Sequence, residues 1–118
     1  MEQVVIIQHK FTSLNEYINK ERTNRYMAAA IKKKETAIAE EAMSGLSKID
    51  IPCRVSFTWY LTNKRRDLDN IAFAKKFILD GAVSAGVISS DNVQYVIGFE
   101  DFVEYGEEEK VEVRFIYG

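Results

Sequence analysis

Short segments of alternating apolar and polar residues predict four β-strands, because such alternation gives a strand one buried face. The clearest alternation covers residues 54–60, where every second residue is a large apolar one. A β-branched run and two further stretches predict the other strands, at residues 3–8, 93–103 and 111–117. Residues 105–109, which include Gly106, predict a hairpin loop between the last two strands.

Two longer stretches between these strands have the spacing of amphipathic helices. Residues 14–44 contain no Pro or Gly, begin with a capping box formed by Ser13 and Glu16, and end before Gly45. A break within this stretch is compatible with the polar residues around Asn24. The apolar stripe predicted to face the core consists of Met27, Ile31, Ile38 and Ala42.

The second helical stretch covers residues 68–85, and Gly86 is its predicted left-handed stop. Its predicted apolar stripe consists of Leu68, Ile71, Ala72, Ile78, Leu79 and Ala82. Together, the elements follow the order β-α-β-α-β-β. This order predicts an α/β (α+β) fold, a two-layer sandwich with helices packed on a mixed sheet.

The chain of 118 residues and 13.6 kDa is long enough for one core, so we expect a single domain spanning residues 1–118. No apolar run approaches the ~20 residues of a membrane span, and no membrane partner is expected. The first residues lack the pattern of a signal peptide. One cysteine, Cys53, and one histidine, His9, argue against an intrachain disulfide and a zinc site. A reduced, cytoplasmic setting is therefore expected.

The net charge of −2 conceals an uneven distribution of charge along the chain. Residues 1–91 carry fourteen basic and eleven acidic side chains, whereas residues 92–118 carry two and seven. Basic residues gather in two runs, Lys32-Lys33-Lys34 and Lys64-Arg65-Arg66. These six residues are candidates for contacting the phosphates of DNA. The alternative is a solvated helix face together with a basic loop.

Three aspartates are candidates for a metal site. Asp67 and Asp69 stand two residues apart directly after a predicted strand, and their side chains converge if the backbone between them is extended. Asp91 lies in the turn beyond the second helix and joins them if the fold returns that turn to the helix start. Three carboxylates form a hard-oxygen site suited to Mg²⁺ or Mn²⁺, which activates water and neutralises the charge of a phosphodiester. The alternative is that these acids only cap a helix and form a turn.

Two adjacent lysines are candidates to act beside these acids. On a continuous helix, Lys76 shares a face with Asp69, seven residues earlier, and we expect it to face the acidic site. Its alternative role is an ion pair with Asp80. Lys75 falls inside the apolar stripe and is the second candidate.

Three segments of this region together resemble the RusA-type Holliday junction resolvases of phages and prophages. They are Arg66-Asp67-Leu68-Asp69-Asn70, Lys76-x-x-x-Asp80-Gly81-Ala82 and Ala85-Gly86-Val87-Ile88-x-x-Asp91. The resemblance covers about residues 54–97, and the run Lys32-Lys33-Lys34 is similar to basic runs in the phage branch.

The resemblance implies a homodimeric, Mg²⁺-dependent endonuclease that cuts four-way DNA junctions by paired incisions, in a bacterial or phage-infected cell. The catalytic residues that it implies are Asp67, Asp69, Asp91 and Lys76, of which the three aspartates hold the metal. In better-known members the lysine follows the second aspartate by four residues, where this chain has Phe73. The alternative function is a non-catalytic DNA-binding module in which the acids serve only as helix caps.

Overall fold

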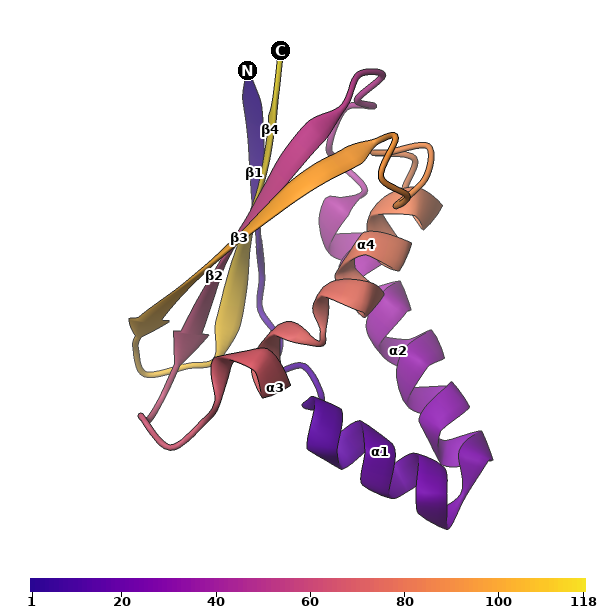
Figure 1. Ribbon diagram of the computed structural model, residues 1–118, viewed down its shortest axis with the longest axis vertical. Helices are drawn as coiled ribbons and strands as arrows, with labels where there is room; N and C mark the ends of the chain where they lie inside the picture. Colours follow the sequence, from indigo (N-terminus) through magenta and orange to yellow (C-terminus); the bar gives the residue numbers. More distant parts are fainter.

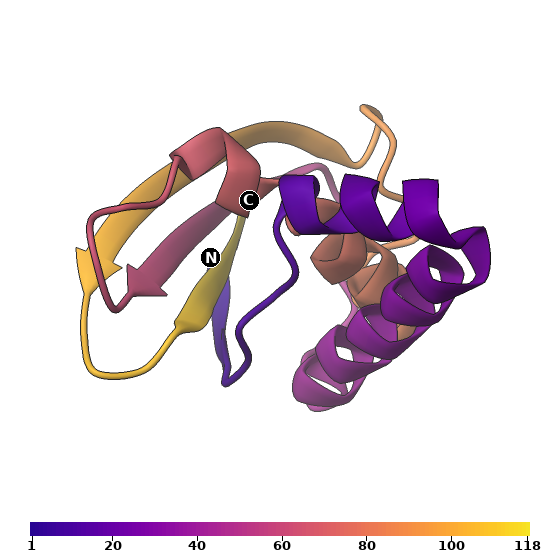
Figure 2. The same ribbon diagram turned by 90° about the horizontal axis from the view of Figure 1, so that it is seen from below.

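The strands of the protein form one sheet, and the helices lie together on one side of it (Figures 1 and 2). A computed structural model describes residues 1–118. Its elements are, in chain order, β1 (Glu2–Ile7), α1 (Leu14–Thr23), α2 (Arg25–Met43), β2 (Cys53–Leu61), α3 (Leu68–Ala72), α4 (Lys75–Ser84), β3 (Val96–Tyr105) and β4 (Lys110–Tyr117). This arrangement confirms the predicted sandwich of helices on a mixed sheet.

The sheet has the strand order β1-β4-β2-β3. Strand β2 pairs parallel with β3 and antiparallel with β4, while β1 pairs antiparallel with β4. The segment with α3 and α4 connects β2 to β3, because parallel neighbours need a long crossover. Met1 and Tyr117 exchange backbone hydrogen bonds of 2.7 and 2.9 Å. The first and last strands therefore lie side by side (Figure 1).

The predicted hairpin at residues 105–109 is wrong. Strands β3 and β4 lie on opposite sides of β2, and the segment between them passes the end of β2, where the Gly106 N–H donates to the Leu61 carbonyl at 2.9 Å. The physical reason is that β2 and β4 each bury every second residue almost completely and take the two inner positions of the sheet, which leaves β3 on the outer edge of β2. Strand β3 also begins three residues later than predicted, because residues 93–95 form a turn.

The first predicted helix is two helices, α1 and α2, which meet at Asn24. The backbone of Asn24 is extended (φ −164°, ψ 107°), and its side chain accepts from the Tyr26 N–H at the start of α2. The predicted core stripe of this region is partly wrong, since Met27 is 40% exposed. The residues of α2 that are buried are Ala28, Glu35, Ala39 and Met43. This stripe is shifted by one position because small side chains let α2 pack closely against α4 near Gly81.

The second predicted helix is also two helices, α3 and α4, separated by Phe73 and Ala74. Phe73 packs with Tyr17 and Phe77, with ring centroids 5.3 Å from each, which draws the start of α1 onto this junction. The Asn15 N–H of α1 also donates to the Asn70 side chain at 2.9 Å. Contacts with α1 therefore accompany the change in chain direction after α3.

The core lies between the sheet and helices α2 and α4. Its largest side chains that are almost fully buried include Phe57, Phe77, Phe115, Ile7, Met43, Ile49 and Ile78. Most of the second predicted stripe is buried, but Leu68 is 38% exposed. Gly86 has φ +77°, as expected for a left-handed stop after α4. None of the helices combines the length and apolar character needed to cross a membrane.

Candidate functional site

Asp67 and Asp69 lie exposed at the start of α3. Asp67 is the N-cap residue with an extended backbone, but its carboxylate makes no capping hydrogen bond. The Asp69 carboxylate accepts only from the N–H of the adjacent Asn70, at 2.9 Å. Neither carboxylate forms an ion pair. The side-chain cap that we weighed for Asp67 is therefore absent, and both groups remain free to bind a cation.

Asp91 lies at the start of α4 rather than with the other two aspartates. The Lys76 ammonium donates to Asp91 at 3.2 Å and to Asp80 at 3.1 Å. Hydrogen bonds to Asp80 and then to Asp91 raise the pKa of Lys76 above its ordinary value of 10.5. Lys76 is 55% exposed, so this charge is close to solvent. The structure thus brings together two predicted site residues, Lys76 and Asp91, and adds the predicted ion pair with Asp80.

The helix break changes which lysine lies beside Asp69. We expected Lys76 to share a face with Asp69 on a continuous helix, but α3 and α4 are separate, so the offset of seven residues does not apply. A hollow of about 590 Å³ contains Asp69 and Lys75 in its wall. The rest of the wall consists of Leu68, Ala72, Phe73 and Asp101.

Asp101 is a site residue that the sequence reasoning missed. It comes from β3, and its carboxylate accepts from the Lys75 ammonium at 2.6 Å. One signal could have revealed it: Asp101 alternates with Phe99 and Val103, so an acid occupies the face of the strand that should be apolar.

No three acidic, histidine or cysteine side chains of the protein are grouped as a three-ligand metal site requires. The donor chemistry of Asp67 and Asp69 nevertheless fits Mg²⁺, because this ion is usually bound through one or two carboxylates together with waters and substrate phosphates. Asp67 and Asp69 are two such carboxylates, both exposed at the start of α3. The extended backbone on which we expected them to converge is absent, because Leu68 between them is already the first residue of α3.

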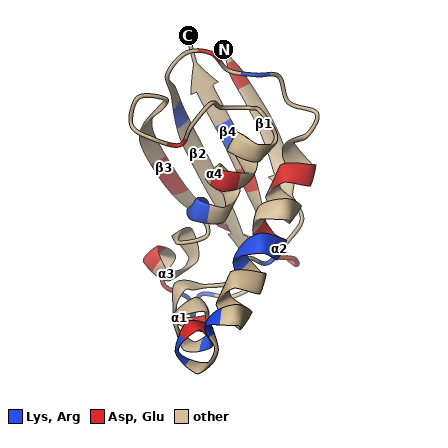
Figure 3. Cartoon of the chain, turned by 90° about the vertical axis from the view of Figure 1, so that its right-hand side faces the viewer, with Lys and Arg blue, Asp and Glu red and all other residues tan.

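The basic run on α2 is exposed and lies beside α4 (Figure 3). Lys32 and Lys33 line a hollow of about 480 Å³ between the two helices, and Asp80 lies in the opposite wall. Asp80 in turn binds Lys76. Asp80 therefore separates Lys32 and Lys33 from Lys76. Lys34 is exposed and forms no ion pair.

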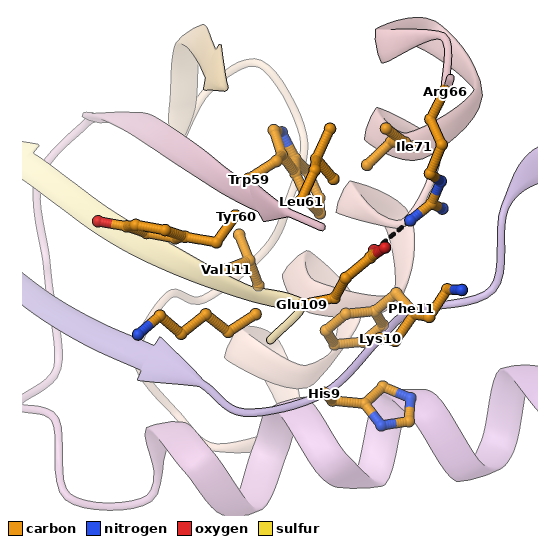
Figure 4. A pocket seen from close by; sticks show the side chains of 11 residues that line it. His9, Lys10, Phe11, Trp59, Tyr60, Leu61, Arg66, Ile71, Glu109 and Val111 are labelled. Carbon is orange, nitrogen blue, oxygen red and sulfur yellow. Dashed lines mark hydrogen bonds and ion pairs between the residues drawn. The ribbon is translucent and has the colours of Figure 1, made fainter. Parts of the chain in front are cut away.

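The second basic run, before α3, divides into two kinds of residue. The Arg66 guanidinium forms an ion pair with Glu109, and the two side chains are 15% and 10% exposed. Figure 4 shows this pair beside Leu61, in a hollow of about 10 Å³ that holds no more than one water. Arg66 therefore anchors its loop. Lys64 and Arg65 are exposed to solvent, and the Lys64 ammonium lies 5.4 Å from the centroid of the Tyr105 ring.

Comparisons with family models and with curated sequences identify no relative of the chain. No protein-family model matches the chain, and no curated protein sequence matches it. The side chains described above, and the resemblance of their motifs to RusA-type resolvases, therefore carry the functional inference.

Proposed function

We propose that this protein is a Mg²⁺-dependent, structure-selective DNA endonuclease that resolves four-way (Holliday) junctions. The observation that carries the proposal is the pair of exposed carboxylates without ion pairs, Asp67 and Asp69, with Lys75 in the wall of the same hollow as Asp69. Free acids next to a lysine are the groups that phosphodiester hydrolysis needs. The resemblance of the same segment to RusA-type resolvases supports junction DNA as the substrate.

Asp67 and Asp69 would hold the ion through their free carboxylates, together with waters and substrate phosphate oxygens. Asp91 is the third ligand that the resemblance implies, but in this structure it pairs with Lys76. Bound Mg²⁺ would supply Lewis acidity and would make water a stronger nucleophile. Lys76 would stabilise the negative charge that develops on the phosphate in the transition state. Hydrogen bonds to Asp80 and Asp91 raise the pKa of Lys76 and so favour its charged form. In the net reaction a water oxygen bonds to phosphorus, one phosphorus–oxygen ester bond breaks, and the released alcohol gains a proton.

The basic side chains would hold the DNA without reading its sequence, because phosphate contacts carry no base information. Lys32, Lys33, Lys34, Lys64 and Arg65 are available for such contacts, whereas Arg66 would act through its loop. A four-way junction has approximate two-fold symmetry, so a homodimer would present one site to each of two opposed strands. A strict monomer at assay concentrations would contradict paired incision. The proposed setting is the cytoplasm of a bacterial or phage-infected cell.

The alternative is a DNA-binding module without nuclease activity. The separation of Asp91 from Asp67 and Asp69 favours this alternative, because the three acids do not form one group. Mixing the protein with Mg²⁺ and a labelled synthetic four-way junction distinguishes the two functions. Cleavage supports the nuclease, and binding without cleavage at several metal concentrations and pH values supports the module.

The substitution Asp69→Asn tests the site directly. We expect it to abolish cleavage and preserve junction binding, because it keeps the size of the side chain but removes a charged ligand. The matched control is Asp50→Asn, at an aspartate whose side chain is 78% exposed and whose only ion pair is a 3.7 Å contact with Lys48. This control should cut at the wild-type rate. Near-normal cleavage by Asp69→Asn would show that the assigned site is wrong.

A further inference from the structure

Asp101 occupies an unusual position in the sheet. It lies on β3 directly opposite Phe57 of β2, on the face that the helices cover. Its neighbours on that face of β3 are Phe99 and Val103. A carboxylate among apolar side chains is costly unless its oxygens accept hydrogen bonds, and both oxygens of Asp101 do.

The two oxygens of Asp101 are held by different donors. The Trp59 indole N–H donates to Oδ1 at 2.9 Å, and the Lys75 ammonium donates to Oδ2 at 2.6 Å. Trp59 is only 3% exposed and stacks on Phe57, so its indole is fixed in the core. The orientation of the carboxylate is therefore set from the core side, and the carboxylate in turn sets the position of Lys75.

Lys75 is held much more tightly than its neighbour Lys76. Its side chain is 20% exposed, against 55% for Lys76. Its ammonium also lies over the ring of Phe99, at 4.7 Å from the centroid, which is within the range of a cation–π contact. Since an ammonium has three N–H donors and Asp101 accepts one, Lys75 keeps donors for a ligand in the hollow that it lines with Asp69.

Stability alone does not account for this arrangement. A partly buried ion pair is often replaceable by apolar side chains without loss of stability. A lysine fixed in advance beside a free carboxylate is instead the kind of charge that stabilises a transition state, because it needs no rearrangement during the reaction.

We propose that Asp101 is a positioning residue, oriented by Trp59, which holds the Lys75 ammonium so that it donates to a non-bridging oxygen of the scissile phosphate beside Asp69. The inference rests on the proposed endonuclease function and deepens it by assigning a second lysine and its support. Lys75 transfers no proton in this role.

The test measures single-turnover cleavage of a labelled four-way junction at saturating protein. We expect Asp101→Asn and Lys75→Met each to slow cleavage by about 10- to 100-fold, with junction affinity measured without divalent metal unchanged. The double variant should be no slower than the slower single variant, because Asp101 acts through Lys75. A structural role alone would not produce this non-additivity together with unchanged affinity. Lys75→Arg should recover part of the rate.

The matched control is Glu100→Gln on the same strand. Glu100 forms a 2.7 Å ion pair with Arg54 outside this hollow, and its loss should leave the cleavage rate unchanged. If Asp101→Asn does not fold, Trp59→Phe removes the orienting N–H while Asp101 and Lys75 remain, and it should slow cleavage too.

Failure of this inference is distinct from failure of the proposed function. If the wild type cuts junctions and Asp101→Asn cuts equally well, or if the two single losses multiply in the double variant, only the positioning role is overturned. A fall in affinity that accounts for the whole loss of cleavage overturns it as well. If the wild type cuts no junction with any divalent metal, both proposals are wrong.

Discussion

Gly81 is the residue at which α4 approaches α2 most tightly. A Cβ atom at this position would lie 2.6 Å from the Ala39 Cβ and 2.8 Å from the Glu40 backbone nitrogen. Both distances are shorter than van der Waals contact, and a helix backbone cannot move aside locally. Only glycine, which has no Cβ atom, therefore permits the observed packing of the two helices.

We expect Gly81→Ala to destabilise the protein by about 1–3 kcal/mol, because the added methyl group pushes the helices apart. Urea unfolding of the variant and the wild type measures the difference. Gly45→Ala is the control, since a Cβ there meets nothing within 4 Å, and its effect should be small. An unchanged midpoint for Gly81→Ala would contradict the observed helix contact.

At the residue scale, the chemistry of the site was predictable only where neighbours in sequence define it. Asp67, Asp69 and Lys76 lie close together in the sequence, in two neighbouring motif segments, and could be singled out directly. Asp101 could not be connected with Lys75, because their contact depends on the parallel pairing of β3 with β2. Glu35, which accepts from the Thr12 N–H and contacts His9 at 2.5 Å, was missed because these contacts depend on how α2 packs against the segment between β1 and α1.

At the scale of elements, the junction between α1 and α2 depends on one side chain. Asn24 ends α1, where its N–H donates to the Lys20 carbonyl, and begins α2, where its side chain accepts from the Tyr26 N–H. One residue therefore satisfies backbone groups of two helices.

We expect Asn24→Ala to cost about 1 kcal/mol of stability through loss of the N-cap, measured by thermal or urea unfolding. Asn19→Ala is the control, because this exposed residue lies inside α1, where Ala is the better helix former. The control should be neutral or slightly stabilising. Equal losses from both substitutions would contradict the capping role.

The existence and type of these elements followed from periodicity, and the break at Asn24 agrees with the break considered there from the polar residues, but the break at Phe73 and Ala74 was not expected. The second junction contains no Pro, Gly or capping side chain, so no local signal stops the helix there. At the second junction, packing of Phe73 on Tyr17 and Phe77 accompanies the break. The contact between Phe73 and Tyr17 joins residues more than fifty positions apart and cannot be predicted from the spacing of residues along one helix. The expectation that Lys76 shares a helix face with Asp69 therefore rested on one continuous helix, whereas α3 and α4 are separate.

At the scale of the whole molecule, metal binding should be visible as added stability. Mg²⁺ at ten times its dissociation constant should stabilise the folded protein by about 1.4 kcal/mol, which raises Tm by ~3–6 °C. Thermal unfolding at millimolar Mg²⁺ measures the shift. The double variant Asp67→Asn/Asp69→Asn should lose it, because both free carboxylates are gone. An equal shift in that variant would place the cation elsewhere.

The distribution of charge over the molecule makes a second prediction. Reversing Lys32 and Lys33 to Glu should weaken junction binding and reduce the dependence of log Kd on log salt by about two, since each phosphate contact releases counterions. The protein should remain folded, because both side chains are exposed on α2. Lys48→Glu, at an exposed lysine outside the two basic runs, should leave the slope unchanged. A slope unaffected by the double reversal would exclude this face from DNA binding.

A mixed sheet covered by helices was predictable from the order of the elements along the chain, but the order of the strands within that sheet was not. A short connection between two strands, such as residues 106–109, is compatible with a hairpin and with passage around a third strand. The choice depends on which strands take the inner positions of the sheet, and that comparison needs all four strands at once.

The pairing of β1 with β4 has a consequence for how the chain folds as it is made. Residues 2–7 leave the ribosome well before their partners, residues 111–116. Until β4 has been synthesised, β1 has no place in the sheet and β2 presents an open edge that can pair with other chains. The nascent chain therefore holds an incomplete sheet from the synthesis of β1 until that of β4, and unpaired strand edges of this kind favour aggregation.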